Sequence, residues 1–147
     1  MPRAAPAGAG AGVPPEPVLR KIRIPFVQRA RLVHAGTARE VFHVDLGIQG
    51  VFAELDAPLP AVDDVEVRFR IPGNEIPIVA RCRVAWWHAP GEPPKALPGG
   101  VGLAFAEMSW ADRDRIRDHV AAHCRRTPRG RRFSRRWPGD GGEEESS

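Results

Sequence analysis

The sequence has only two cysteines, Cys82 and Cys124, among its 147 residues. Two cysteines cannot form a disulfide framework, and they do not have the paired spacing of a structural zinc site. No apolar run approaches the roughly 18 residues that a helix needs to cross a bilayer. The N-terminal stretch also lacks the apolar segment of a secretory signal. We therefore expect neither a disulfide-rich secreted fold nor a membrane span, and we expect a cytoplasmic protein.

The patterns of common catalytic sites are missing as well. The chain has no nucleophile–base pair and no glycine-rich phosphate-binding loop. His119 and His123 are four residues apart, with Cys124 adjacent, which is a spacing that could suit zinc. No third ligand can be assigned, and no glutamate follows the first histidine as metalloprotease chemistry requires. We interpret the two histidines as a surface pair on a helix, and we expect no enzyme, no metal and no cofactor.

Glycine and proline are abundant, with 15 and 16 residues, so much of the chain is expected to turn or loop. Residues 1–19 are predicted to be a flexible Ala/Gly/Pro-rich leader, and residues 20–124 a single domain. Residues 125–147 are predicted to be a charged, disordered tail with seven arginines against four acidic residues. The net charge of +4 comes mostly from this tail, so we expect at most weak nucleic-acid binding and no specific nucleic-acid partner.

The domain between these ends has mainly the pattern of β-strands. Short apolar alternations predict strands at 29–34, 40–45, 49–55, 65–71, 76–87 and 101–106. Alternation along the fifth strand places Trp86 in the core and Trp87 outward. Trp87 is therefore a candidate contact surface, because exposed aromatic residues often anchor protein interfaces.

One helix is predicted after the last strand. Ser109 with Asp112 three residues later resembles a capping box, and Trp110, Ile116, Val120 and Cys124 repeat at roughly helical spacing. The charged residues from Asp112 to Asp118 are expected to form its solvated face. Six short strands followed by one helix predict a mainly β fold, a small six-stranded antiparallel barrel with one C-terminal α-helix.

Several segments, taken in order, resemble the PilZ domain, a bacterial module that characteristically binds cyclic di-GMP. They are Arg23-Ile24-Pro25, the run from Val44 to Val51, Ala57-Pro58-Leu59, the strand Val65–Ile71, Arg83-Val84-Ala85-Trp86, Gly100 to Phe105 and Met108 to Arg113. The resemblance covers residues 20–124. It implies the same barrel and a role in bacterial signalling, with control of motility or surface structures.

The resemblance also implies ligand contacts from two motifs of the family. In R-x-x-x-R the second arginine falls on Arg23, whereas the first falls on Leu19, with Arg20 one residue out of register. In (D/N)-x-S-x-x-G, Asp45 and Gly50 fit, and Gly47 replaces the serine. The candidate cyclic di-GMP residues are therefore Arg20, Arg23, Asp45, Gly47 and Gly50.

The two departures from these motifs predict weakened binding. A lost hydroxyl contact costs about 1 kcal/mol and a lost arginine–phosphate contact roughly 1.5–3 kcal/mol. Together they weaken binding by on the order of 100-fold. A purely structural interpretation stays open, in which the basic residues are solvated and Asp45 with the two glycines builds a corner that needs positive φ. We favour an adaptor that acts on a protein partner of unknown identity; the alternative is a single-domain cyclic di-GMP receptor.

Overall fold

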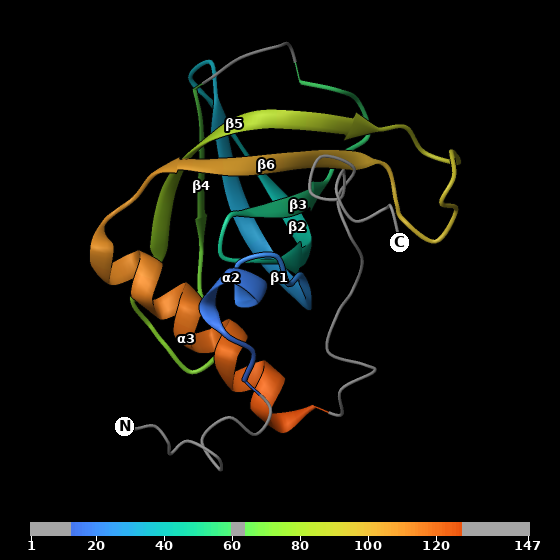
Figure 1. Ribbon diagram of the computed structural model, residues 1–147. Coiled ribbons are helices and arrows are strands. Elements are labelled where there is room, and N and C mark those ends of the chain that lie inside the picture. Colours follow the sequence, from blue (N-terminus) through green and yellow to red (C-terminus); the bar gives the residue numbers. More distant parts are fainter. Residues whose placement is uncertain (1–12, 60–63, 128–147) are drawn as a thin grey trace, which may run out of the picture.

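The computed structural model describes residues 13–59 and 64–127, and it contains the closed antiparallel barrel that the sequence predicts (Figure 1). Its strands follow the order β1-β2-β3-β6-β5-β4, and β4 closes the barrel by pairing with β1. The bounds are Ile24–His34 for β1, Thr37–Leu46 for β2, Gly50–Glu54 for β3, Val65–Phe69 for β4, Ile78–His88 for β5 and Gly100–Glu107 for β6. Most of the expected leader and tail, residues 1–12 and 128–147, lies outside the described residues.

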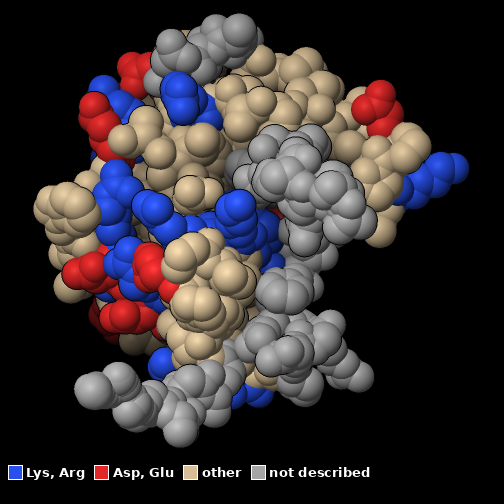
Figure 2. All heavy atoms as spheres, in the orientation of Figure 1, with Lys and Arg blue, Asp and Glu red and all other residues tan. Residues whose placement is uncertain are grey.

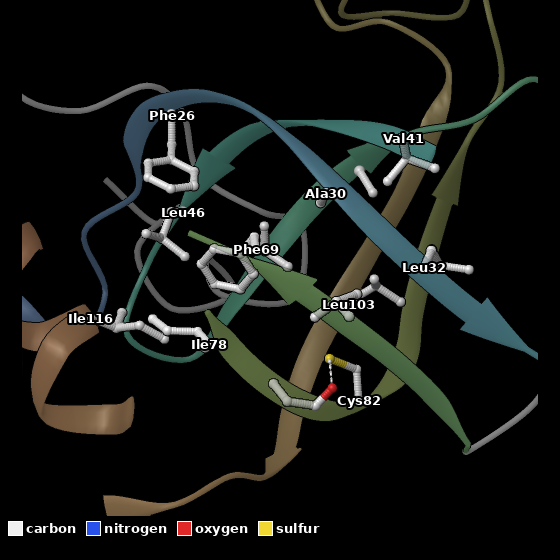
Figure 3. Packing of buried hydrophobic residues seen from close by; sticks show 14 of the residues in the cluster. Phe26, Ala30, Leu32, Val41, Leu46, Phe69, Ile78, Cys82, Leu103 and Ile116 are labelled. Carbon is white, nitrogen blue, oxygen red and sulfur yellow. Dashed lines mark hydrogen bonds between the residues drawn. The ribbon is translucent and has the colours of Figure 1, made fainter. Parts of the chain in front are cut away.

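The barrel interior is filled by the alternating apolar residues of the strands. In β4, Val65, Val67 and Phe69 are buried, whereas Arg68 between them is exposed. Figure 3 shows Phe69 together with Leu46 and other apolar side chains pointing into the same space. This alternation fixes which residues the barrel presents to solvent, because successive side chains of a strand point to opposite faces.

Helix α3, Trp110–Arg126, covers one end of the barrel (Figure 1). It begins as predicted, because the backbone N–H of Asp112 donates to Ser109 Oγ at 3.0 Å. Its buried residues Ile116, Val120 and Cys124 are spaced by four, so they form one face toward the core. Among the helices in the described part of the chain, none is long and apolar enough to cross a membrane.

Two residues at the start of α3 differ from the prediction. Trp110, expected on the apolar face, is 80% exposed. Asp112, expected on the solvated face, is buried, and its Oδ2 accepts a hydrogen bond from Val79 N at 3.2 Å. Its other oxygen forms an ion pair with Arg115. The helix therefore docks on β5 through a carboxylate, and this rotates the first turn so that the tryptophan faces solvent.

A short helix precedes the barrel where the sequence predicts only leader. Helix α2, Glu16–Leu19, is one turn long, and its Leu19 is 4% exposed within the main apolar cluster. Arg117 of α3 pairs with Glu16 at 3.1 Å, so the two helices lie side by side at the same end of the barrel (Figure 1). The folded domain therefore begins before residue 20.

A β-bulge in β5 reverses the expected orientation of its two tryptophans. The pairing with β6 shifts between Val84 and Trp86, so one extra residue of β5 stands opposite β6. Beyond this bulge Trp87 packs against the main core, whereas Trp86 packs with Phe52, its ring centroid 5.3 Å away. The prediction of an outward Trp87 is therefore wrong, because strict alternation does not continue through a bulge.

Candidate functional site

The candidate ligand-binding residues meet at the corner between β2 and β3. The chain turns over residues 47–49, and the N–H of Gly47 donates to the carbonyl of Gly50 at 2.9 Å. The pairing of β2 with β3 shifts between His43 and Asp45, which is a bulge directly before the turn. The turn and the bulge together fix where the Asp45 side chain lies.

Arg23 and Asp45 form a buried ion pair at this corner. Arg23 Nη2 donates to Asp45 Oδ1 at 2.9 Å, and the side chains are 3% and 0% exposed. Arg23 stands directly before β1, whose first residues pair with the end of β2, so the two side chains come from neighbouring backbone segments. The charged groups that the family motifs assign to a ligand therefore contact each other. We call Arg23, Asp45 and Gly47 the closed corner.

Glycine is required at position 47 because a side chain there would meet neighbouring atoms, and not because its φ angle is positive. A Cβ atom at this position would lie 2.7 Å from the carbonyl oxygen of Ile22 and 2.9 Å from Arg23 Nη1. Neither distance is one that a real side chain can keep. Positive φ occurs in the described residues at other glycines, Gly36, Gly73 and Gly91, so the expected need for positive φ at this corner is wrong. Glycine fits here in place of the family serine because the Ile22 carbonyl and the Arg23 side chain together occupy the space that a Cβ atom would need.

Leu19, at the first position of the arginine motif, and the adjacent Arg20 lie in opposite environments. Leu19 stands where the family has its first arginine and is buried in the core. Arg20 caps the C-terminal end of α2, and its side chain is exposed. The structure thus brings Arg23, Asp45, Gly47 and Gly50 together, and it leaves Arg20 at the surface. A ligand at the closed corner would have to replace the internal ion pair with its own contacts.

His43 is a buried polar residue that the sequence reasoning missed. Its ring is fully buried beside Phe69, with centroids 4.8 Å apart, and beside Phe26, at 6.3 Å. Neither ring nitrogen has a hydrogen-bond partner among the described residues. Burial lowers the pKa of His43 to about 3, so the ring is neutral. The signal was the alternation of β2, which places His43 on the same inward face as Val41.

The helix histidines His119 and His123, considered above as metal ligands, lie on α3 at the end of the barrel that this helix covers. His119 packs edge-on against Phe26, with ring centroids 5.5 Å apart. Burial, together with Arg126 and His123, lowers the pKa of His119, and burial with Arg126 lowers that of His123. Within residues 13–59 and 64–127, no group of three or more His, Cys, Asp or Glu side chains could hold a metal ion.

Comparison with known proteins identifies the fold. Among solved structures the chain is similar to the inhibitor of motility MotI/DgrA of Bacillus subtilis, with a TM-score of 0.55 and 14% identity over 67% of this chain and 46% of that one. It is similar to YcgR of Escherichia coli in complex with c-di-GMP, with a TM-score of 0.52 and 13% identity over 70% and 44%. It is also similar to the PilZ domain of YcgR with c-di-GMP, with a TM-score of 0.50 and 12% identity over 73% and 91%.

The chain spans less than half the length of the first two proteins and nearly all of the isolated PilZ domain. Comparison with curated protein sequences gives no match. The family model of the PilZ domain matches residues 19–122, from the buried leucine of α2 through most of α3. This match covers well over half of the sequence, and the chain therefore belongs to the PilZ domain family.

Proposed function

We propose that this chain is a non-catalytic PilZ adaptor of bacterial cyclic di-GMP signalling, which acts through contact with a protein partner and whose own nucleotide binding is weakened or lost. The observation that carries the proposal is the closed corner, in which Arg23 and Asp45 are buried against each other over Gly47. The structural relatives support a role in cyclic di-GMP signalling, since one is named an inhibitor of motility and another was solved in complex with c-di-GMP.

The buried ion pair opposes ligand binding because each of its two side chains already binds the other. Arginine binds phosphate strongly because its planar guanidinium offers a fork of donors. In the closed corner this fork is turned to Asp45, so a ligand must first separate two buried charges, and separation of a buried pair is costly. The buried Leu19 offers no donor in place of the first arginine of the motif. Both effects lower affinity for cyclic di-GMP.

Trp110 is the residue that best supports a protein contact. Its side chain is 80% exposed, and the guanidinium of Arg113 lies 5.7 Å from its ring centroid. Ile76, also exposed, lies close to this helix, because Arg115 of α3 donates to its carbonyl at 2.5 Å. Large exposed aromatic residues with an adjacent arginine are frequent anchors of interfaces. Trp110 therefore replaces Trp87 as the candidate contact surface.

Calorimetry with cyclic di-GMP and the full chain tests the nucleotide part of this proposal. We expect no binding heat at tens of micromolar protein, with folding checked by circular dichroism. Micromolar binding that Arg20→Ala weakens and Arg125→Ala does not would instead support the receptor. Arg20 and Arg125 are both exposed, so these two substitutions change charge equally without emptying the core.

A gain-of-binding variant sharpens the test. Gly47→Ser restores the family hydroxyl and, by its Cβ atom, forces Arg23 out of its present position. We expect this variant to bind cyclic di-GMP more tightly than the wild type. Addition of Leu19→Arg would complete both motifs, but it buries a guanidinium in the core, so its folding must be measured first. A folded Gly47→Ser variant with unchanged titration would contradict the weakened-site explanation.

The protein contact is tested separately by affinity capture from bacterial lysate. Trp110→Ala should lose a bound protein that the wild type retains. Val27→Ala is the matched control, because Val27 is exposed on β1 and its removal also deletes apolar surface. Equal capture by wild type and Trp110→Ala would remove α3 from the proposed interface.

A further inference from the structure

An arginine-lined groove lies on the outside of the barrel, across β1 and β4. It has a volume of about 560 Å³, within the usual range of small-ligand sites. Its lining includes Arg29 and Arg31 of β1, Arg68 and Arg70 at β4, and one acidic residue, Glu40 of β2. None of the residues of the closed corner lines it. We call these four arginines with their groove the arginine groove.

The strand register forces these arginines together. Ala30 pairs with Phe69, and Arg31 pairs directly with Arg68. Because alternation turns Ala30 and Phe69 inward, the arginines beside them point outward on adjacent strands. Like charges directly opposite each other destabilise a sheet. On its other side Arg31 pairs directly with Glu40 of β2, and the same carboxylate also lies 3.8 Å from Arg29, so one acidic group stands against two arginines of β1. The register therefore maintains a surplus of positive charge that an anion would relieve.

Acidic side chains compensate this charge only partly. Arg29 and Glu40 are 3.8 Å apart and both well exposed, so their attraction is weak. Arg68 Nε donates to Glu66 at 2.7 Å. Within residues 13–59 and 64–127, Arg31 and Arg70 make no ion pair. Toward the described part of the chain, the guanidinium groups of Arg31 and Arg70 in the arginine groove thus have no carboxylate partner.

The position of Arg29 is also restrained. Its guanidinium lies 5.7 Å from the ring centroid of Phe42, the residue that pairs with it across β1 and β2. A guanidinium near an aromatic ring gains a weak cation–π attraction there, which favours one region of space for Arg29. Residues two apart on a strand are separated by about 7 Å, so the groove presents several donor groups at short, regular intervals.

We propose that the arginine groove binds an oligophosphate, a small molecule with two or more adjacent phosphate groups. Guanidinium groups donate two parallel hydrogen bonds to phosphate oxygens, and several such groups are needed for several linked phosphates. The open shape of the groove admits a chain of phosphates and leaves any attached group in solvent. This site is separate from the closed corner and does not depend on whether that corner binds cyclic di-GMP.

Calorimetry with inorganic tripolyphosphate at low salt tests the proposal. The double variant Arg31→Gln with Arg68→Gln should lose at least about tenfold in affinity. Arg125→Gln with Arg113→Gln removes the same charge from α3 and should leave affinity within about twofold. Equal losses in both double variants, or no binding by the wild type, would overturn the site.

Three further measurements separate the alternatives. A single-stranded oligonucleotide that binds more tightly than tripolyphosphate, and loses affinity in the Arg31/Arg68 double variant, would overturn the small oligophosphate in favour of nucleic acid. Arg20→Ala, which removes the exposed arginine beside the family's arginine motif, should leave tripolyphosphate affinity unchanged, so binding through that motif is distinguishable from binding here. The double variant should remain folded, with a free energy of unfolding within about 1 kcal/mol of the wild type, so that its lost affinity does not come from lost folding.

Discussion

Arg23 and Arg31 are eight residues apart in one stretch of chain, yet the barrel uses them in opposite ways. Arg23 is buried and paired with Asp45, whereas Arg31 is exposed and lies opposite another arginine. The family motif singles out the first, and no motif singles out the second. Environment, not residue type, decides which arginine is available to a ligand.

The comparison extends to the charges that surround them. Figure 2 shows acidic and basic side chains intermixed over the end of the molecule that α3 covers, so that opposite charges there are close neighbours. The arginine groove instead has four basic residues and one acidic residue in its lining. A buried arginine requires its partner, and an exposed one tolerates a like charge because water screens it.

The largest expected effect comes from breaking the buried pair. Asp45→Ala leaves Arg23 charged and buried without this carboxylate, and we expect a loss of about 3–5 kcal/mol in the free energy of unfolding. Urea denaturation at pH 7 measures it. Arg23→Met with Asp45→Leu, which removes both charges, should recover most of the loss. If Asp45→Ala costs less than about 1 kcal/mol, the pair is solvated and the corner is open.

The next largest effect concerns His43, the near neighbour of Asp45, which is buried and has no hydrogen-bond partner in the part of the chain that the structure describes. The pKa of His43 is lowered from 6.5 to about 3, so the unfolded chain binds its proton more readily than the native protein does. Stability is therefore complete above about pH 6.5 and falls as the pH drops toward 3. The expected loss is about 3 kcal/mol at pH 4.

Urea denaturation across this pH range, with His43→Leu as the matched variant, measures the contribution of His43. His119 and His123 also have lowered pKa values, and they add smaller losses of the same sign to both proteins. The wild type should lose stability more steeply than His43→Leu between pH 6.5 and 4. Parallel curves for the two proteins would show that protonation reaches the ring at little cost.

An effect of intermediate size is expected from a substitution that tests why glycine stands at position 47. Gly47→Ala should cost about 1–3 kcal/mol, because its Cβ atom meets the Ile22 carbonyl and the Arg23 guanidinium. Gly36→Ala is the contrasting control, since nothing lies within 4 Å there and its penalty comes from positive φ alone. In the Arg23→Met background the Gly47→Ala cost should shrink. An unchanged cost would mean that the backbone carbonyl, not the arginine, requires glycine.

The sequence predicted the barrel and α3 because their signals are local. Alternation in β4 and the Ser109 cap each need only a few neighbouring residues. The orientation of Trp87 was mispredicted, because a bulge is a property of two paired strands. The closed corner was missed for the same reason: motif matching assigns Arg23 and Asp45 to a ligand, and only the fold shows that they contact each other.

The smallest effect concerns Arg31, and its sign is what matters. Arg31→Gln removes a charge that stands opposite Arg68 on β4 and opposite Glu40 on β2. Because Glu40 is shared with Arg29, we expect the repulsion to outweigh the attraction and stability to rise by a few tenths of a kcal/mol at low salt. The gain should disappear at about 1 M salt, where the screening length falls to about 3 Å. Thermal denaturation at the two salt concentrations measures it, with Arg125→Gln as the control for net charge. A loss of stability at low salt would mean that Arg31 has a favourable partner in solution, and the arginine groove would then hold one available guanidinium fewer.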